Sequence, residues 1–223
     1  MTLTPKTWKA AIAVRGVLLA TALLLAGCAQ NITGTAVTAA GGAPDPTSGG
    51  DEAQCAQVSA PLEDIPAEDD REPHLRIPIP AGWERNTMMD SQVIRFAIVS
   101  TELIANSFAT NAVVTLESAR GKQTPDEVFE QNRGNLETMM GAYDLETESN
   151  TTCGFPSETT RYMAPPMGPA PERPIIMHAV VASSGSTTYL ATLTIQTTDP
   201  DNPTYVSDSQ DIIDGFQMLL PSS

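Results

Sequence analysis

The sequence predicts an α+β fold: one domain of strands and two helices that follows an export segment. Three observations support this. Several short segments alternate apolar with other residues, as strands do, and residues 124–140 carry the start and stop signals of an amphipathic helix. Hydrophobic residues make up 41% of the 223 residues, which is enough for one packed core.

The first 27 residues predict a lipoprotein signal peptide. Lys6, Lys9 and Arg15 precede an apolar run at 16–25 that is shorter than the roughly 20 residues needed to span a bilayer. The LAGC sequence that ends at Cys28 resembles the lipobox of bacterial lipoproteins, in which the cysteine receives a diacylglyceryl group. The resemblance implies that the mature chain starts at Cys28 and is held by lipid at the extracytoplasmic face of the cell membrane. An ordinary secretory signal with a chance cysteine is the alternative.

Residues 28–54 predict the lipidated cysteine and a flexible stalk. Residues 29–54 are rich in Ala, Gly, Thr, Ser and Pro and contain almost no large apolar residue, so they cannot offset the entropy lost on ordering. As a flexible coil these residues span about 28 Å. The folded domain is therefore expected at 55–223, some tens of Å from the bilayer.

The charge of the chain excludes some functions. The formal charge is −15, and removal of 1–27 takes away three cations and no acid, which leaves 9 Lys and Arg against 27 Asp and Glu. Such an acidic surface repels nucleic-acid phosphates and anionic lipid headgroups. With three cysteines and two histidines in the whole chain, we predict neither a metal nor another cofactor.

Cys55 and Cys153 remain once Cys28 carries lipid, and two cysteines allow one pairing. Outside the cytosol an oxidised pair is the expected state, so we predict a disulfide that holds the end of the stalk against the domain. Two free buried thiols or a redox site are the alternatives, although the sequence has no C-x-x-C motif.

In the first half of the domain, residues 61–72 are acidic and rich in proline and predict a loop. Strands are predicted at 75–79, 92–99 and 112–118, with an irregular segment at 101–111.

The second half begins with the helix. Thr124 and Glu127 form a capping box around Pro125, and Gly141 ends the helix after residue 140. The remaining elements are strands at 145–152 and 158–163, a hairpin of 174–182 with 187–196, a capping turn at 199–203, and a second helix at 204–219.

The order of these elements, behind a lipobox and an Ala/Thr/Gly stalk, resembles the actinobacterial LpqN/LpqT lipoprotein family. The IPIPAGW sequence at 77–83 is part of the likeness, which covers about residues 75–220. The resemblance implies a PsbP-like α/β/α sandwich, an antiparallel sheet with helices packed on its faces, and no established catalytic residues. The Cys55 and Cys153 pair and the proline-rich stretch after Met163 depart from that pattern.

No catalytic residue is predicted, because the common hydrolase, metalloprotease and nucleotide-binding motifs are absent from the sequence. His178 is a possible base in a triad, but it alternates with apolar residues and is better read as a structural histidine. Glu146 and Glu148 share one strand face, which fits an acid and base pair or a coincidence. Residues 199–203 begin like a calcium loop but lack its later ligands.

Two segments are candidates for a binding surface. The stretch 163–174 holds five prolines between two strands, so Met163 and Met167 are expected to be exposed and suited to adaptable apolar contacts. The turn at Trp83, with Met88 close behind it, is the second. A plain surface connection and methionines that fill the core are the alternatives.

We therefore predict a cell-envelope lipoprotein that is not an enzyme and acts as a binding module. It would be a carrier for a lipid or other apolar small molecule, or a scaffold for an envelope protein. An envelope hydrolase without a known motif and an accessory subunit of an envelope complex are the alternatives.

Overall fold

A computed structural model describes residues 46–47 and 52–221. The predicted signal peptide at 1–27, the predicted lipid site at Cys28 and most of the stalk lie outside the described residues. Among the residues described, no helix is long and apolar enough to cross a membrane.

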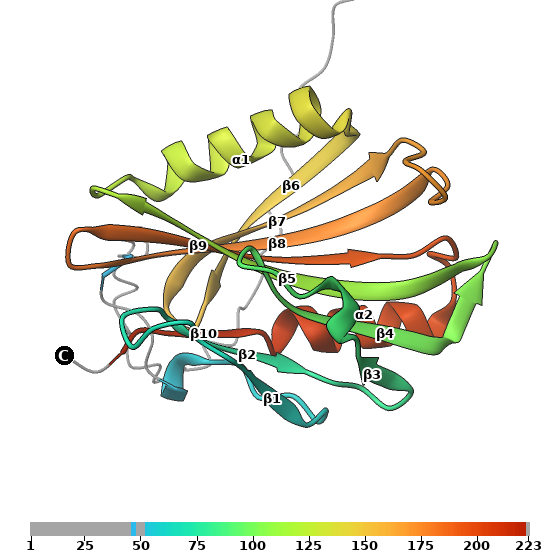
Figure 1. Ribbon diagram of the computed structural model, residues 1–223, viewed down its shortest axis with the longest axis horizontal. Coiled ribbons are helices and arrows are strands. Elements are labelled where there is room, and N and C mark those ends of the chain that lie inside the picture. The colour runs from blue at the N-terminus through green and yellow to red at the C-terminus, as the bar shows by residue number, and fades with distance from the viewer. Residues whose placement is uncertain (1–45, 48–51, 222–223) are drawn as a thin grey trace, which may run out of the picture. The chain divides into compact units, whose positions relative to one another are not determined.

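The centre of the domain is an antiparallel sheet of seven strands, with α1 on one face and α2 on the other (Figure 1). The face that carries α2 is also covered by a three-stranded sheet of order β1-β2-β10. The predicted α/β/α sandwich is thus confirmed, with this small sheet as an unpredicted addition. The strand order of the large sheet is β3 (Trp83–Arg85), β4 (Ile94–Ala105), β5 (Phe108–Arg120), β9 (Thr187–Gln196), β8 (Arg173–Ser184), β7 (Phe155–Ala164) and β6 (Tyr143–Thr152).

The hydrophobic core has two parts, one on each face of the large sheet. The larger part lies beneath α2 and the small sheet and includes Phe155, Leu193, Ile212 and Phe216. Beneath α1, smaller clusters contain residues of that helix and of β7 and β8. Because β8 is buried between the two parts, its residues are apolar on both faces with few exceptions.

Helix α1 (Pro125–Met140) confirms the prediction made from its capping signals. The hydroxyl of Thr124 accepts a hydrogen bond from the backbone N–H of Glu127, and the Glu127 side chain accepts one from the backbone N–H of Thr124. These bonds satisfy N–H groups that have no partner inside the helix, and the hydrogen bonds that the Thr124 N–H and hydroxyl donate to the Glu127 carboxylate lower the pKa of that carboxyl. Gly141 ends the helix in the left-handed conformation, with φ of 66°.

The hairpins are confirmed, and one predicted loop is wrong. The predicted strands at 145–152, 158–163, 174–182 and 187–196 correspond to β6, β7, β8 and β9. The segment at 101–111, expected to be a loop or irregular, belongs mostly to β4 and β5, which continue through it to a two-residue turn at Asn106 and Ser107, although the register shifts between Val99 and Ile104. Both turn residues have positive φ, and register shifts in this hairpin hid the strand alternation in the sequence.

The C-terminal helix was predicted too long. Helix α2 (Pro203–Asp214) begins at the expected turn, where the side chain of Asn202 accepts a hydrogen bond from the Thr204 N–H. It ends at Gly215, after which β10 (Gln217–Leu219) pairs with β2 (His74–Pro78). The apolar pattern of this segment predicts Val206 on the buried side of the helix, but Val206 is 54% exposed.

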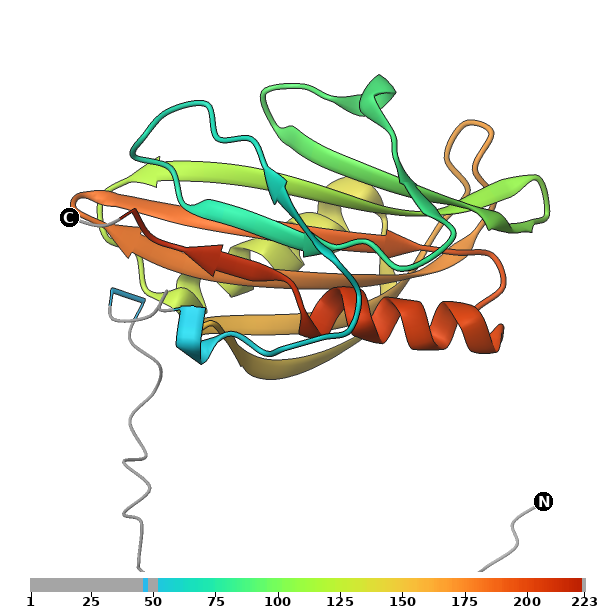
Figure 2. The same cartoon turned by 90° about the horizontal axis from the view of Figure 1, so that it is seen from below.

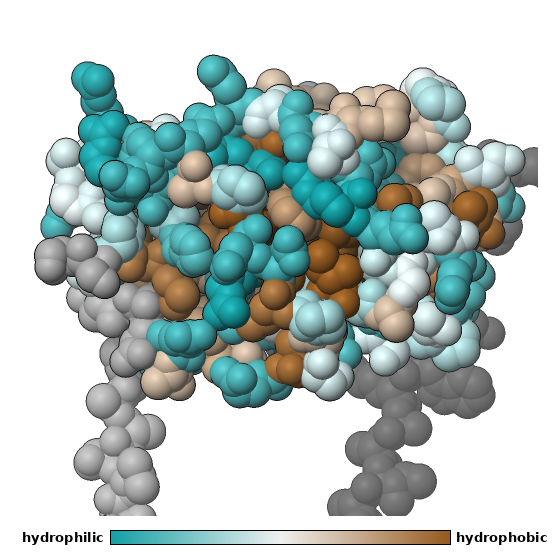
Figure 3. All heavy atoms as spheres, turned by 60° about the horizontal axis from the view of Figure 1, so that its bottom comes forward, coloured by the Kyte–Doolittle hydropathy of each residue, from teal (hydrophilic) through white to brown (hydrophobic). Residues whose placement is uncertain are grey.

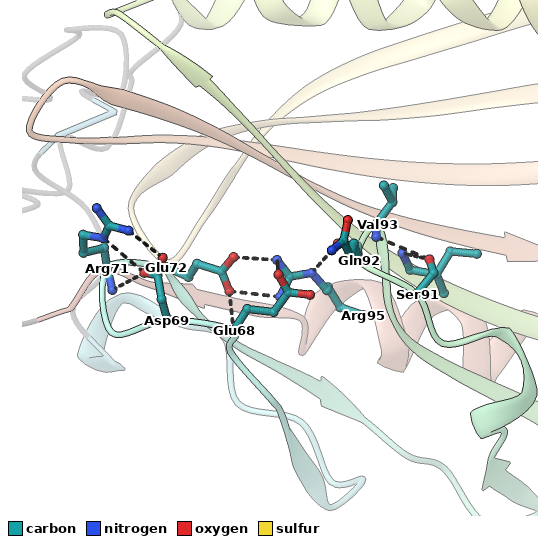
Figure 4. A network of polar contacts seen from close by, with 9 residues as sticks. Glu68, Asp69, Arg71, Glu72, Ser91, Gln92, Val93 and Arg95 are labelled. Carbon is teal, nitrogen blue, oxygen red and sulfur yellow. Dashed lines mark hydrogen bonds and ion pairs between the residues drawn. The ribbon is translucent and has the colours of Figure 1, made fainter.

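The acidic segment at 61–72 is more ordered than predicted. It starts with β1 (Leu62–Ile65), which pairs with β2, and continues as a loop that is tied to the large sheet (Figure 4). The guanidinium of Arg95 on β4 donates hydrogen bonds to both carboxylate oxygens of Glu72. Burial raises the pKa of Glu72, but the bonds from Arg95 and from the Glu68 N–H outweigh burial, and the net shift is downward.

Candidate functional site

Two adjoining cavities form a groove between α2 and the β6, β7 and β8 end of the large sheet. Their volumes are about 450 Å³ and about 370 Å³, and three residues line both: Arg161, Gln210 and Ile213. Each volume lies within the range of small-molecule sites. Figure 2 shows α2 lying along this side of the sheet, and Figure 3 shows hydrophobic residues between hydrophilic ones on the face that carries α2.

The smaller cavity is mainly apolar. One wall comes from β6, β7 and β8 and the other from α2. Burial raises the pKa of Tyr205 to about 12, so its phenol stays neutral. The apolar and aromatic lining is Tyr162, Met163, Pro174, Ile175, Ile176, Pro200, Tyr205, Val206 and Ile213.

The larger cavity, called the polar cavity below, is lined by more polar residues than apolar ones and contains groups of both charge signs. Arg161 stands at its junction with the apolar cavity, and Glu148 and Asp214 also line it. Its floor includes Phe216. The uncharged polar lining is Gln54, Asn150, Thr151, Thr152, Thr159 and Gln210.

His178 lies in the wall of the polar cavity, and its imidazole has hydrogen-bond partners at both nitrogens. Nδ1 is 2.8 Å from the hydroxyl of Thr159, and Nε2 is 2.8 Å from the hydroxyl of Thr152. The Thr152 hydroxyl donates onward to Ser157 Oγ, so Nε2 carries the proton and Nδ1 accepts from Thr159. The Asn150 amide donates to Thr159 Oγ1, which completes the chain.

Burial lowers the pKa of His178 to about 4, against a weaker opposite effect from Asp214. The imidazole is therefore neutral at physiological pH. The sequence prediction of a hydrogen-bonded histidine on the side of Ile176 and Val180 agrees with this geometry, because those two residues also belong to the core beneath α2.

One end of the groove is held by the disulfide between Cys55 and Cys153 that the sequence led us to expect. Cys55 and its neighbour Ala56 line the polar cavity just after η1 (Glu52–Gln54), and Cys153 belongs to the two-residue turn between β6 and β7. Glu52 in η1 forms an ion pair with Arg76 on β2, with 2.9 Å between the charged atoms. The end of the stalk thus forms part of the groove.

The four residues predicted for a binding surface are not brought together. Trp83 is only 5% exposed, and its indole N–H donates to the Asp208 carboxylate of α2 at 2.8 Å, so it belongs to the core and not to a surface. Met88, in η2 (Thr87–Met89), is 93% exposed. It follows β3, which four strands separate from β7 in the sheet, or about 24 Å at the usual strand spacing.

Met163 and Met167 lie at the other end of the sheet from Met88. Met163 is half-buried on β7 and lines the apolar cavity. Met167 is 54% exposed in the proline-rich loop, where it forms an isolated bridge with Ala170. Of the four residues, only Met163 reaches the groove.

The sequence does not reveal that α2 forms a wall of the groove: Gln210 looks like an ordinary solvent-facing helix position, and Val206 is predicted on the buried side of the helix, yet both line the groove. Sequence reasoning noted that Glu146 and Glu148 share a strand face, and both line the groove. Within the described part of the chain, no group of three or more His, Cys, Asp or Glu residues is arranged to hold a metal ion.

Residues 56–219 match the family described as "Probable lipoprotein LpqN", which is most of the chain. The chain belongs to the LpqN family. The structure of LpqN from Mycobacterium tuberculosis, described as involved in cell envelope biogenesis, is similar with a TM-score of 0.58 at 17% identity. The similarity covers 73% of this chain and 92% of that one, and at this identity it establishes the fold alone.

Two further structures resemble this LpqN-family chain more weakly. Cyanobacterial PsbP from Synechocystis sp. PCC 6803 has a TM-score of 0.49 at 16% identity, covering 74% of this chain and 96% of that one. The Ran-binding protein Mog1p of Saccharomyces cerevisiae has a TM-score of 0.44 at 12% identity, covering 72% and 97%. A search of curated proteins found no match.

Proposed function

We propose that the chain is a membrane-anchored cell-envelope lipoprotein that binds an apolar or amphiphilic small molecule and catalyses no reaction. The observation that carries the proposal is the groove beside α2, where an apolar cavity of about 370 Å³ adjoins a polar one of about 450 Å³. A molecule with an apolar part and a polar part fits this order of linings.

The chemistry of the groove favours binding over catalysis. Both nitrogens of His178 are engaged with threonine hydroxyls, and neither of these two partners is a carboxylate that would stabilise an imidazolium. Its lowered pKa also makes it a weak base at neutral pH. An envelope hydrolase using His178 is the alternative, and it predicts that His178→Ala abolishes turnover in a folded protein.

Membrane attachment rests on the family and on Cys28. Members of this family are described as probable lipoproteins, and the LAGC sequence places a cysteine where a lipid would be attached. Two acyl chains would hold the protein stably at a membrane, whereas one would not. Replacement of Cys28 by Ala is expected to release the protein or leave the unprocessed precursor. Unchanged membrane retention with an unchanged mature mass would refute the anchor.

Ligand binding is tested by native mass spectrometry of the protein purified from its own host. We expect a bound apolar or amphiphilic molecule on the wild-type protein and its loss in Val206→Trp, because Val206 is exposed on α2 and lines the apolar cavity. Met139→Trp is the matched control, since Met139 is 77% exposed on α1, away from the groove. A wild-type protein that carries no ligand, or equal loading of both variants, would contradict the proposal.

A protein-binding scaffold remains the second candidate, and the exposed Met167 in the proline-rich loop favours it. Crosslinking in intact cells from position 167 distinguishes the two. A specific envelope partner together with an empty groove would support the scaffold.

A further inference from the structure

The large sheet has one long open edge. β6 is its last strand, and no described strand pairs with the outer side of β6 (Figure 1). Its ten residues are mostly exposed. At the opposite edge, β3 is only three residues long, and the hydrogen bonds that the Asn86 N–H and the Arg85 guanidinium donate to the Ala97 carbonyl extend its pairing with β4.

The hairpin geometry shows which backbone groups of β6 face outward. Thr152 and Phe155 flank a two-residue turn whose residues have φ of 50° and 84°, as in a type I′ hairpin. In such a hairpin the flanking pair exchanges hydrogen bonds, and every second pair does the same. Pro156, which has no N–H, lies opposite Thr151 in a non-hydrogen-bonded pair, where no N–H is needed between the two strands.

It follows that the backbones of Glu148 and Asn150 point toward β7. Those of Thr147, Ser149 and Thr151 point outward, each with an N–H and a C=O. The side chains of Glu146 and Glu148 lie on the face of β6 that lines the groove. The open edge is therefore also the rim of the groove, and an added strand would extend the groove wall.

We propose that β6 is a docking edge for an extended, cationic segment of a partner protein, which pairs with it as an eighth strand. The charge of the edge identifies the occupant. Asp144, Glu146 and Glu148 are exposed carboxylates along its groove side, and a cationic residue at alternate positions of the added strand would lie opposite them.

Two other occupants fit less well. A second copy paired through β6 would bring its own Asp144, Glu146 and Glu148 onto the same face, and like charges across a strand pair are unfavourable. The chain's own stalk, residues 29–54, contains no Lys or Arg. The proposal does not depend on the groove being occupied.

The test uses the chain from residue 28 onward with Cys28→Ser, which keeps every described residue. The probe is a ten-residue peptide of alternating Lys and Val, compared with the same peptide carrying Glu in place of Lys. NMR titration is expected to show binding of the Lys peptide and at least about tenfold weaker binding of the Glu peptide. The titration extends to about 1 mM peptide, so that it detects a dissociation constant on the order of 1 mM. Absence of binding by the Lys peptide at that concentration would overturn the proposal.

Amide exchange locates the binding. The amides of Thr147, Ser149 and Thr151 should exchange rapidly in the free protein and slow down when the peptide is added, whereas those of Glu148 and Asn150 are slow in both states. Peptide binding without any change at the three outward amides would refute strand addition.

Variants separate the backbone contribution from the charge contribution. Ser149→Pro removes an outward N–H without removing a bond to β7 and should weaken binding about tenfold, while Ser149→Ala keeps the N–H and should not. The double variant Glu146→Gln with Glu148→Gln should weaken it about fivefold. If Ser149→Pro fails to fold, a peptide methylated at the backbone nitrogens that face β6 should lose binding to the unaltered protein. Equal affinity for the methylated and the unmethylated peptide would overturn the proposal. So would a homodimer of the wild-type protein that Ser149→Pro abolishes, because β6 would then pair with a second copy.

Discussion

Acidification should destabilise the domain through His178, which is the buried histidine of the groove wall. The perturbation is protonation of an imidazole whose hydrogen bonds fit the neutral form: its Nδ1 accepts a hydrogen bond from the Thr159 hydroxyl, so a proton on that nitrogen would break the bond. Burial away from solvent adds to the cost and lowers its pKa to about 4.

The size and direction of the effect follow from the two protonation equilibria. In the unfolded chain a histidine titrates near 6.5, whereas in the folded chain His178 titrates at about 4, so the unfolded chain binds more protons between these values. The stabilisation is fully present above about pH 6.5, falls as the pH drops toward 4, and does not change below that. At 1.36 kcal/mol for each pKa unit, the loss is about 3 kcal/mol.

Urea unfolding at pH 7, 6, 5 and 4 measures this loss, and His178→Gln serves as the reference because its amide cannot titrate. All other ionisable groups are the same in the two proteins, so the difference between the two curves isolates His178. The wild-type protein should lose about 3 kcal/mol more than the variant between pH 7 and 4. If the two curves of unfolding free energy against pH ran parallel, His178 would have an ordinary pKa. That result would refute a buried, neutral imidazole with hydrogen bonds at both nitrogens.

Three further predictions concern stability. Replacement of both Cys55 and Cys153 by Ala should lower the free energy of unfolding by about 2–4 kcal/mol, because the bond closes a loop across 98 positions; no change under chemical denaturation would mean that the bond does not constrain the unfolded chain. Gly215→Ala should lower the free energy of unfolding by about 1–3 kcal/mol, since the added Cβ would clash with a methyl carbon of Val58; a melting temperature equal to that of the wild-type protein would contradict this clash. Thr124→Ala should cost about 1 kcal/mol by removing the cap of α1, while Thr124→Ser should cost much less; equal losses in denaturant melts would argue against the capping box.

The elements with strong local signals could be predicted from the sequence. Helix α1 follows from its capping box and from Gly141, and the β8 and β9 hairpin follows from alternation on both sides of a short polar turn. Local chemistry decides these elements, so the tertiary structure agrees with them.

The misassigned elements depend on contacts between distant segments. β1 is a strand because it pairs with β2, and the acidic loop after it is held by Arg95 on β4. β10 looks like the last turn of a helix until it pairs with β2. No local pattern carries this information, because hydrogen bonds to partners far along the chain override local propensity.

The candidate site was hidden for a related reason. Trp83 looked like a surface aromatic because it follows a turn, yet Asp208, 125 positions away, gives its indole N–H a hydrogen-bond partner. The groove itself depends on where α2 lies against the sheet, and side chains such as Gln210 become lining residues only through that packing.

The polarity of β6 links the groove to the open edge. A strand that only covers the core has one apolar face, but β6 has Glu146 and Glu148 on one face and Thr147 and Ser149 on the other, and Thr152 is its single buried residue. It therefore contributes little to the hydrophobic free energy of folding. What β6 does supply is a charged rim for the groove and a row of outward backbone groups. Glu146 and Glu148 belong both to the rim of the groove and to the open edge. A cationic strand added at this edge would therefore change the electrostatic potential inside the groove, and the affinity for a ligand in the groove would change with it.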